Sequence, residues 1–172
     1  MMKKQFLPNL VLSLTLSFAV VWIGSYITRL VLVYQFFEPV NLELRNLYNT
    51  QNLASVLTMV ISPIVCNIIT FPLFLVSFFL YIFISKINIK NEGWLFLTMM
   101  VIIITAPFEI YLLSMDLSII ELLFSPNYDV NQAINMIRER MVVLSSFPLI
   151  EIFCYIALVF VVVFKPLRKN EN

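Results

Sequence analysis

Two glutamates, Glu109 and Glu151, stand inside runs of sequence that are otherwise almost purely apolar. A carboxylate in hydrocarbon is costly, so each must be paired, protonated or turned toward a cavity. The helix face of Glu109 carries three more polar residues, the four being spaced by seven, four and seven positions: Thr98, Thr105 and Asp116. This stripe predicts that Glu109 is buried against protein or a cavity, and we expect it to be protonated near neutral pH and hydrogen-bonded.

Glu151 shares its helix face with Tyr155, and Asn67 places a polar amide inside another apolar run. Two neighbouring carboxyl groups in a medium of low dielectric could bind a cation or hold protons. The sequence therefore predicts a ligand-binding cavity lined by Glu109, Glu151, Asn67, Tyr155 and Thr105. The alternative is that each acid only hydrogen-bonds a helix turn freed by a proline, or faces a partner subunit.

Prolines inside the apolar runs support the cavity, because each removes a backbone hydrogen bond and kinks its helix. They are Pro63, Pro72, Pro107 and Pro148. Three kinked helices out of four favour a bundle that bulges around a void, and simple kinks are the alternative.

The elements that position these residues must be membrane spans. The chain has 172 residues, of which 61% are hydrophobic and 12% charged, and its mean hydropathy is +0.95. Four runs exceed the roughly 20 residues that cross a bilayer. We predict an all-α, polytopic membrane four-helix bundle in a single domain, residues 1–172, with spans near 7–34, 53–85, 94–115 and 141–164.

The basic residues predict the orientation of the bundle. Seven fall on the side of the chain ends: Lys3, Lys4, Lys86, Lys90, Lys165, Arg168 and Lys169. Four fall on the far side: Arg29, Arg45, Arg138 and Arg140. The excess puts both termini in the cytosol. Arg29 lies near the outer end of the first span, where we expect it to snorkel to the interface, and a buried pairing with an acid is the alternative.

Two far-side segments predict a small helical cap over the mouth of the bundle. Asp129 with Gln132 three residues later is typical of a capping box, which would start a helix that continues into the last span. The apolar residues around Asn41–Leu47 predict a shorter helix before the second span. In the first span, small and polar residues form one helical stripe that predicts a packing seam: Asn9, Ser13, Ser17, Gly24 and Thr28.

The composition also excludes several kinds of site. The chain has no histidine, which rules out histidine–zinc, bis-histidine haem and Ser–His or Cys–His sites. Its two glycines are too few for a phosphate-binding loop, and a net charge of +1 argues against nucleic acid as a partner. We therefore predict no catalytic residue, no metal site and no cofactor.

Short motifs spread along the chain resemble those of the EXPERA family, which includes the emopamil-binding and sigma-two-receptor-like proteins. They are Arg45-Asn46, Cys66 with Pro72, Pro107, Glu139-Arg140, Pro148 and Pro166. The resemblance implies four spans, cytosolic termini, a hydrophobic-ligand cavity and an address in the endoplasmic reticulum. The family's glutamate after the cysteine is replaced here by Asn67, so the carboxylates would have to be Glu109 and Glu151.

The leading hypothesis is a non-catalytic membrane protein that binds a hydrophobic ligand, which is sterol-like or lipid-like and includes amines of that kind, in an intramembrane cavity. A second hypothesis is an accessory subunit of a larger membrane complex. A third, a proton-using lipid isomerase or small transporter, is disfavoured by the lack of an inverted repeat and of glycine hinges. If the family resemblance does not hold, the expected location is the bacterial cytoplasmic membrane.

Overall fold

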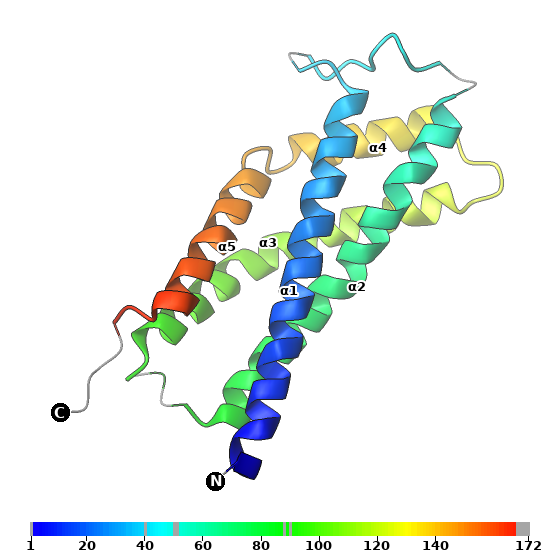
Figure 1. The fold of residues 1–172 in the computed structure, drawn as a ribbon. Coiled ribbons are helices and arrows are strands. Elements are labelled where there is room, and N and C mark those ends of the chain that lie inside the picture. The colour runs from blue at the N-terminus through cyan, green and yellow to red at the C-terminus, as the bar shows by residue number, and fades with distance from the viewer. Residues whose placement is uncertain (1, 40, 50–51, 88, 90, 168–172) are drawn as a thin grey trace.

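The protein is all-helical in a computed structural model that describes residues 2–39, 41–49, 52–87, 89 and 91–167, with side chains from Phe6 onward. These residues contain five helices and no strand (Figure 1): α1 (Met2–Phe36), α2 (Leu53–Ser85), α3 (Gly93–Leu123), α4 (Val130–Val142) and α5 (Phe147–Phe164). Four of the helices, α1, α2, α3 and α5, are long and apolar enough to cross a membrane. The prediction of an integral membrane protein built from four apolar helices is confirmed.

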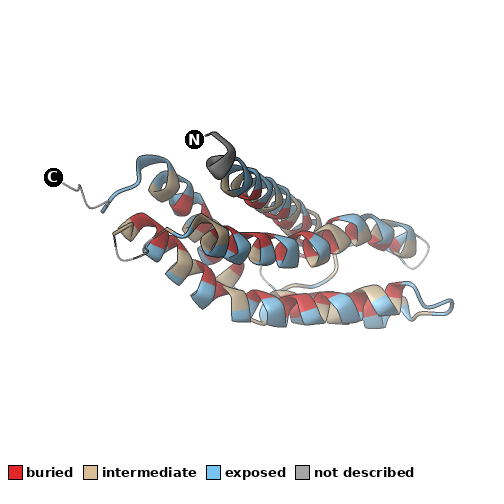
Figure 2. Cartoon of the chain, turned by 90° about the horizontal axis from the view of Figure 1, so that it is seen from below, coloured by how far each residue is buried: buried red, intermediate tan, exposed pale blue. Residues whose placement is uncertain are grey.

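The helices pack mainly as neighbours of α2 and α3. α1 packs along most of α2, while α3 contacts α2, α4 and α5. Figure 1 shows the start of α1 and the end of α5 at one end of the molecule, with α4 and the α1–α2 connection at the other. We call these the terminal end and the α4 end. Viewed from below, the buried faces of the helices point toward one another and the exposed faces point outward (Figure 2).

Local chemistry defines several helix ends. The side chains of Asn49 and Asn52 accept hydrogen bonds from each other's backbone N–H, at 2.8 and 3.0 Å, just before α2 begins. Lys86 and Lys165 take left-handed backbone conformations, with φ of 51° and 45°, and end α2 and α5. A lysine at this point also places positive charge at the negative end of the helix dipole.

The predicted last span is two helices rather than one. Asp129 caps α4, accepting a hydrogen bond from the backbone N–H of Asn131 at 2.9 Å. The helix then ends at Val142, Leu144 adopts a positive φ of 55°, and α5 begins at Phe147. Pro148 is therefore in the first turn of α5, where it costs no hydrogen bond, and the predicted kink at this proline is wrong.

The other boundaries differ in informative ways. α3 continues to Leu123, eight residues beyond the expected end of the third span, so Asp116 lies inside a helix. The predicted short helix around Asn41–Leu47 is absent. That part of the connection is a tight loop: Phe37 forms an isolated antiparallel bridge with Leu44, and the backbone N–H of Arg45 binds the carbonyl of Phe36 at 3.0 Å.

The apolar core is divided into two clusters along the bundle. The cluster toward the terminal end includes Trp22, Phe74 and Tyr155. The cluster toward the α4 end includes Leu57 and Ile119 and takes in the apolar face of α4. On each of the first three helices, buried polar residues fall between the two clusters: Arg29 on α1, Asn67 and Thr70 on α2, and Asp116 on α3. A polar layer thus crosses the interior of the bundle.

Candidate functional site: a polar layer and an apolar cavity

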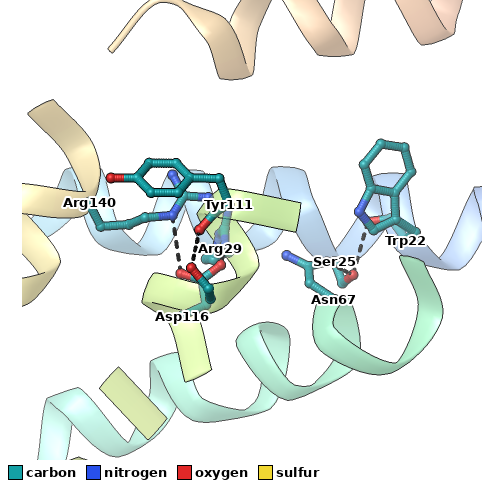
Figure 3. Close-up of polar contacts among 8 residues, drawn as sticks. Trp22, Ser25, Arg29, Asn67, Tyr111, Asp116 and Arg140 are labelled. Atoms are coloured by element: carbon teal, nitrogen blue, oxygen red, sulfur yellow. Dashed lines mark hydrogen bonds and ion pairs between the residues drawn. The ribbon is translucent and has the colours of Figure 1, made fainter. Parts of the chain in front are cut away.

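An ionic triad connects three helices in this layer. Asp116 of α3 forms ion pairs with Arg29 of α1 and with Arg140 of α4, the latter at 3.3 Å between Nε and Oδ1 (Figure 3). All three side chains are buried, with Arg29 only 3% exposed. The prediction that Arg29 snorkels to the interface is therefore wrong. Because α3 continues beyond its expected end, the carboxylate of Asp116 reaches Arg29 in the interior.

The triad has more positive than negative charge. Two guanidinium groups, which stay protonated in proteins, share the one carboxylate of Asp116. The Nη2 atoms of Arg29 and Arg140 have no hydrogen-bond partner among the described residues. Arg29 also stacks its guanidinium over the ring of Tyr26, 4.8 Å from the centroid, which partly offsets its desolvation.

Glu109 and Glu151 are neighbours across the interface between α3 and α5. They are 0% and 1% exposed, and the Tyr26 hydroxyl lies beside Glu151. None of the four carboxyl oxygens has a hydrogen-bond partner of normal geometry within the described part of the chain. The expected burial of Glu109 is confirmed, and its expected hydrogen bond to protein or ligand stays a prediction. The positive charges that interact with Glu109 are those of Arg29 and Arg140.

Asn67 and Thr105 take different positions. Asn67 is fully buried and accepts a hydrogen bond from the Ser25 hydroxyl, which ties α2 to α1 (Figure 3). Thr105 lies 3.0 Å from the Tyr155 hydroxyl, joining α3 to α5. The five predicted site residues are therefore all buried in the bundle, but Asn67 belongs to the α1–α2 contact and not to the pair of acids.

An apolar cavity of about 380 Å³ lies between the four long helices toward the terminal end. Its wall includes Leu12 and Ala19 of α1, Phe78 of α2, Leu95 of α3 and Val159 of α5. Its volume is within the range of about 300–1,000 Å³ that is usual for small-molecule sites.

The cavity reaches the predicted polar site residues at Tyr155. Tyr155 lines it, and the hydroxyl of Tyr155 contacts Thr105, one helical turn from Glu109. Among the predicted site residues only Tyr155 lines this cavity, and Glu109 and Glu151 do not. Val20 and Val159, also in its wall, are 70% and 57% exposed, so the cavity opens laterally between α1 and α5 to the outer surface of the bundle.

The small-residue stripe of the first helix does not serve as a seam within this chain. All five residues are exposed, and nothing lies within 4 Å of a Cβ placed on Gly24. α1 instead packs through the opposite face, with Trp22, Tyr26 and Arg29. The predicted packing seam is therefore not formed within the described chain, and whether it packs against a partner helix stays a prediction.

Sequence reasoning missed the triad. A usable signal was present, since Asp116 shares the stripe of Glu109, and Arg29 lies three and seven residues after Tyr26 and Trp22 on one helix face. Within the part of the chain that is described, no group of three acidic or cysteine residues is placed to hold a metal ion. Comparisons with protein-family models, curated proteins and solved structures found no match for the chain.

Proposed function

We propose that this protein is a non-catalytic integral membrane protein that binds a hydrophobic, lipid-like ligand in the apolar cavity between its four long helices. The observation that carries the proposal is the cavity itself, which is lined mostly by apolar side chains and opens to the surface of the bundle between α1 and α5. Lipid tails can enter such a site without crossing water, so little polar surface is desolvated on entry.

The polar residues support a ligand with one polar end. The hydroxyl pair Thr105–Tyr155 lies where the cavity approaches the polar layer, and the unpartnered carboxyl groups of Glu109 and Glu151 lie beyond it. A hydroxyl, amine or similar head group placed at Tyr155 would find donors and acceptors there, while the tail remains among apolar side chains. A sterol-like ligand, as the EXPERA resemblance suggests, is one member of this class.

The proposal includes an orientation and an address. Both termini lie in the cytosol, and the location is the endoplasmic reticulum if the family resemblance holds and otherwise the bacterial cytoplasmic membrane. The excess of basic residues at the terminal end supports the orientation.

The test is to fill the cavity. Ala19 lines the cavity, so Ala19→Trp should occlude it and sharply reduce the lipid that co-purifies in mild detergent, measured by native mass spectrometry. Ala157 is exposed on α5 and does not line the cavity, so Ala157→Trp is the matched control and should retain lipid as the wild type does. Equal retention by both variants, with both still folded, would refute binding in this cavity.

A second candidate function is an accessory subunit, favoured by the exposed small-residue stripe of α1. Small residues let another transmembrane helix approach closely, and the space beside Gly24 is open. The buried acids do not contribute to such an interface, because Glu109 and Glu151 face the interior of this chain. A stable hetero-complex in mild detergent that dissociates in a Gly24→Leu variant would favour this function.

A further inference from the structure

We propose a second lipid site, specific for an anionic phospholipid, on the seam between α1 and α5 at the α4 end of the molecule. The site is separate from the cavity described above and does not depend on its function. It combines an apolar groove for an acyl chain with basic side chains at the end where a phosphate would lie.

The groove has a volume of about 450 Å³ and is bounded by α1 and α5. Ile27, Leu30 and Val31 form one wall, and Leu149 and Ile152 form the other. From Ile27 to Gln35, the last α1 residue in the wall, the groove follows the helix for about 12 Å, at ~1.5 Å per residue. Because α1 and α5 cross the membrane, this surface contacts acyl chains of the leaflet at the α4 end.

The polar side chains of the groove are at one end only. Tyr34, Gln35 and Arg45 line it where α1 ends. Arg45 is held in place by its Nε, which donates to the carbonyl of Phe37 at 3.0 Å. Glu38 lies 3.9 Å from the same nitrogen and is more than half exposed, so it neutralises Arg45 only weakly. The terminal N–H groups of Arg45 are not used by these contacts.

The ionic triad adds positive charge behind this end. A recess of about 30 Å³, lined by Arg29, Asp116 and Arg140, adjoins the groove, since Leu30 and Tyr34 line both. The two arginines share one carboxylate, and their buried Nη2 atoms are unpartnered. Glu109 and Glu151 are also buried in the bundle, and neither lines the recess or the groove.

This arrangement matches an anionic phospholipid better than a neutral one. Arginine offers paired donors to phosphate oxygens and keeps its charge beside an apolar surface. The acyl chain would lie against Val31 and Ile152. The phosphate would lie at Arg45 and Tyr34, and the triad would attract the negative charge of the phosphate through the recess.

The experiment compares the full-length protein in nanodiscs of phosphatidylcholine with and without phosphatidylglycerol. Wild type should retain phosphatidylglycerol preferentially by native mass spectrometry and melt at a higher temperature in its presence. Arg45→Gln should weaken the apparent affinity about fivefold. Val31 is 53% exposed, so Val31→Trp should block the groove without unfolding the chain and should also abolish the preference.

Two controls make the result specific. Arg138 of α4 does not line the groove, so Arg138→Gln removes the same charge at the same end and should keep the preference. Ala19→Trp should keep it as well, which separates this site from the apolar cavity. Equal retention of the two lipids by wild type, an unchanged preference in Val31→Trp, or an equal loss in Arg138→Gln would overturn the proposal. If inorganic phosphate alone stabilises the protein in phosphatidylcholine discs, the site binds a free anion, and the proposal of a phospholipid ligand is overturned.

Discussion

At the scale of single residues, the defining feature is the buried triad of Arg29, Asp116 and Arg140. Charged groups in the interior of a membrane protein are expensive, and a buried ion pair often stabilises no more than apolar side chains of similar volume would. Their presence therefore points to a task that needs the charge, such as the attraction of an anionic head group. Asp116 is the centre, since it contacts both guanidinium groups.

The first prediction at this scale is that Asp116→Asn destabilises the protein by about 3–5 kcal/mol, because it removes the carboxylate that forms ion pairs with both buried guanidinium groups. Glu109→Gln is the matched control. It is the same acid-to-amide change on the same helix, also fully buried, but the Glu109 oxygens have no hydrogen-bond partner among the described residues. We expect it to fold and to change stability by no more than about 1 kcal/mol.

Unfolding in a graded series of denaturing detergent, followed by circular dichroism, measures both variants. A Glu109→Gln loss as large as that of Asp116→Asn would show that the ionised carboxylate of Glu109 is required by the arginines. A small effect of Asp116→Asn would show that the triad contributes little to the fold.

At the scale of elements, the break between α4 and α5 determines where the site residues lie. α4 is amphipathic and buries Ala133, Ile134 and Ile137 against the other helices, with Arg140 on the same face. A continuous helix through residues 143–146 would instead carry α4 away along the axis of α5. The left-handed conformation of Leu144 makes the turn that lets Arg140 reach Asp116.

The prediction at this scale concerns Leu144. A left-handed conformation costs a non-glycine residue about 1–2 kcal/mol, and a β-branched side chain tolerates it least. Leu144→Gly should therefore leave stability within about 1 kcal/mol of wild type, because relief of strain offsets the lost side-chain contacts. Leu144→Val should be clearly less stable than Leu144→Gly.

Thermal unfolding in one detergent, with both variants side by side, is the measurement. The order of the two midpoints decides the outcome, since glycine in an ordinary helical position would be the more destabilising of the two. A lower midpoint for Leu144→Gly than for Leu144→Val would contradict the turn conformation.

At the scale of the whole molecule, the burial of two arginines increases the difference in basic interface residues between the terminal end and the α4 end. Arg29 and Arg140 are interior ion-pair partners, so they do not act as far-side interface charges. The comparison becomes seven basic residues at the terminal end against Arg45 and Arg138. Of the seven, Lys3, Lys4, Lys90, Arg168 and Lys169 have side chains outside the described residues.

We predict that the connection between α2 and α3 is cytosolic and that α4 is on the opposite side of the membrane. In a background where Cys66 and Cys154 are replaced by alanine, a cysteine at Asn131, exposed at the start of α4, should react with an impermeant maleimide on intact cells. A cysteine at Asn88, which lies outside the described residues, should react only after permeabilisation. The reverse pattern would invert the topology.

The sequence by itself determined the four membrane helices and the inward direction of Glu109, Glu151 and Thr105. These properties depend on local composition and helical periodicity, which a chain carries wherever its helices pack. α2 agrees with its predicted span at both ends, 53 and 85, because asparagines precede it and Lys86 ends it.

Only the tertiary structure decided which polar groups meet. Arg29 and Asp116 are 87 residues apart in sequence, and their pairing required α3 to continue past the expected interface and α4 to fold back over the bundle. The same packing separated the pair of acids from the apolar cavity, leaving Tyr155 as the predicted residue that lines it. Partner choice in a low-dielectric interior depends on the positions of several helices at once, and no local pattern encodes those positions.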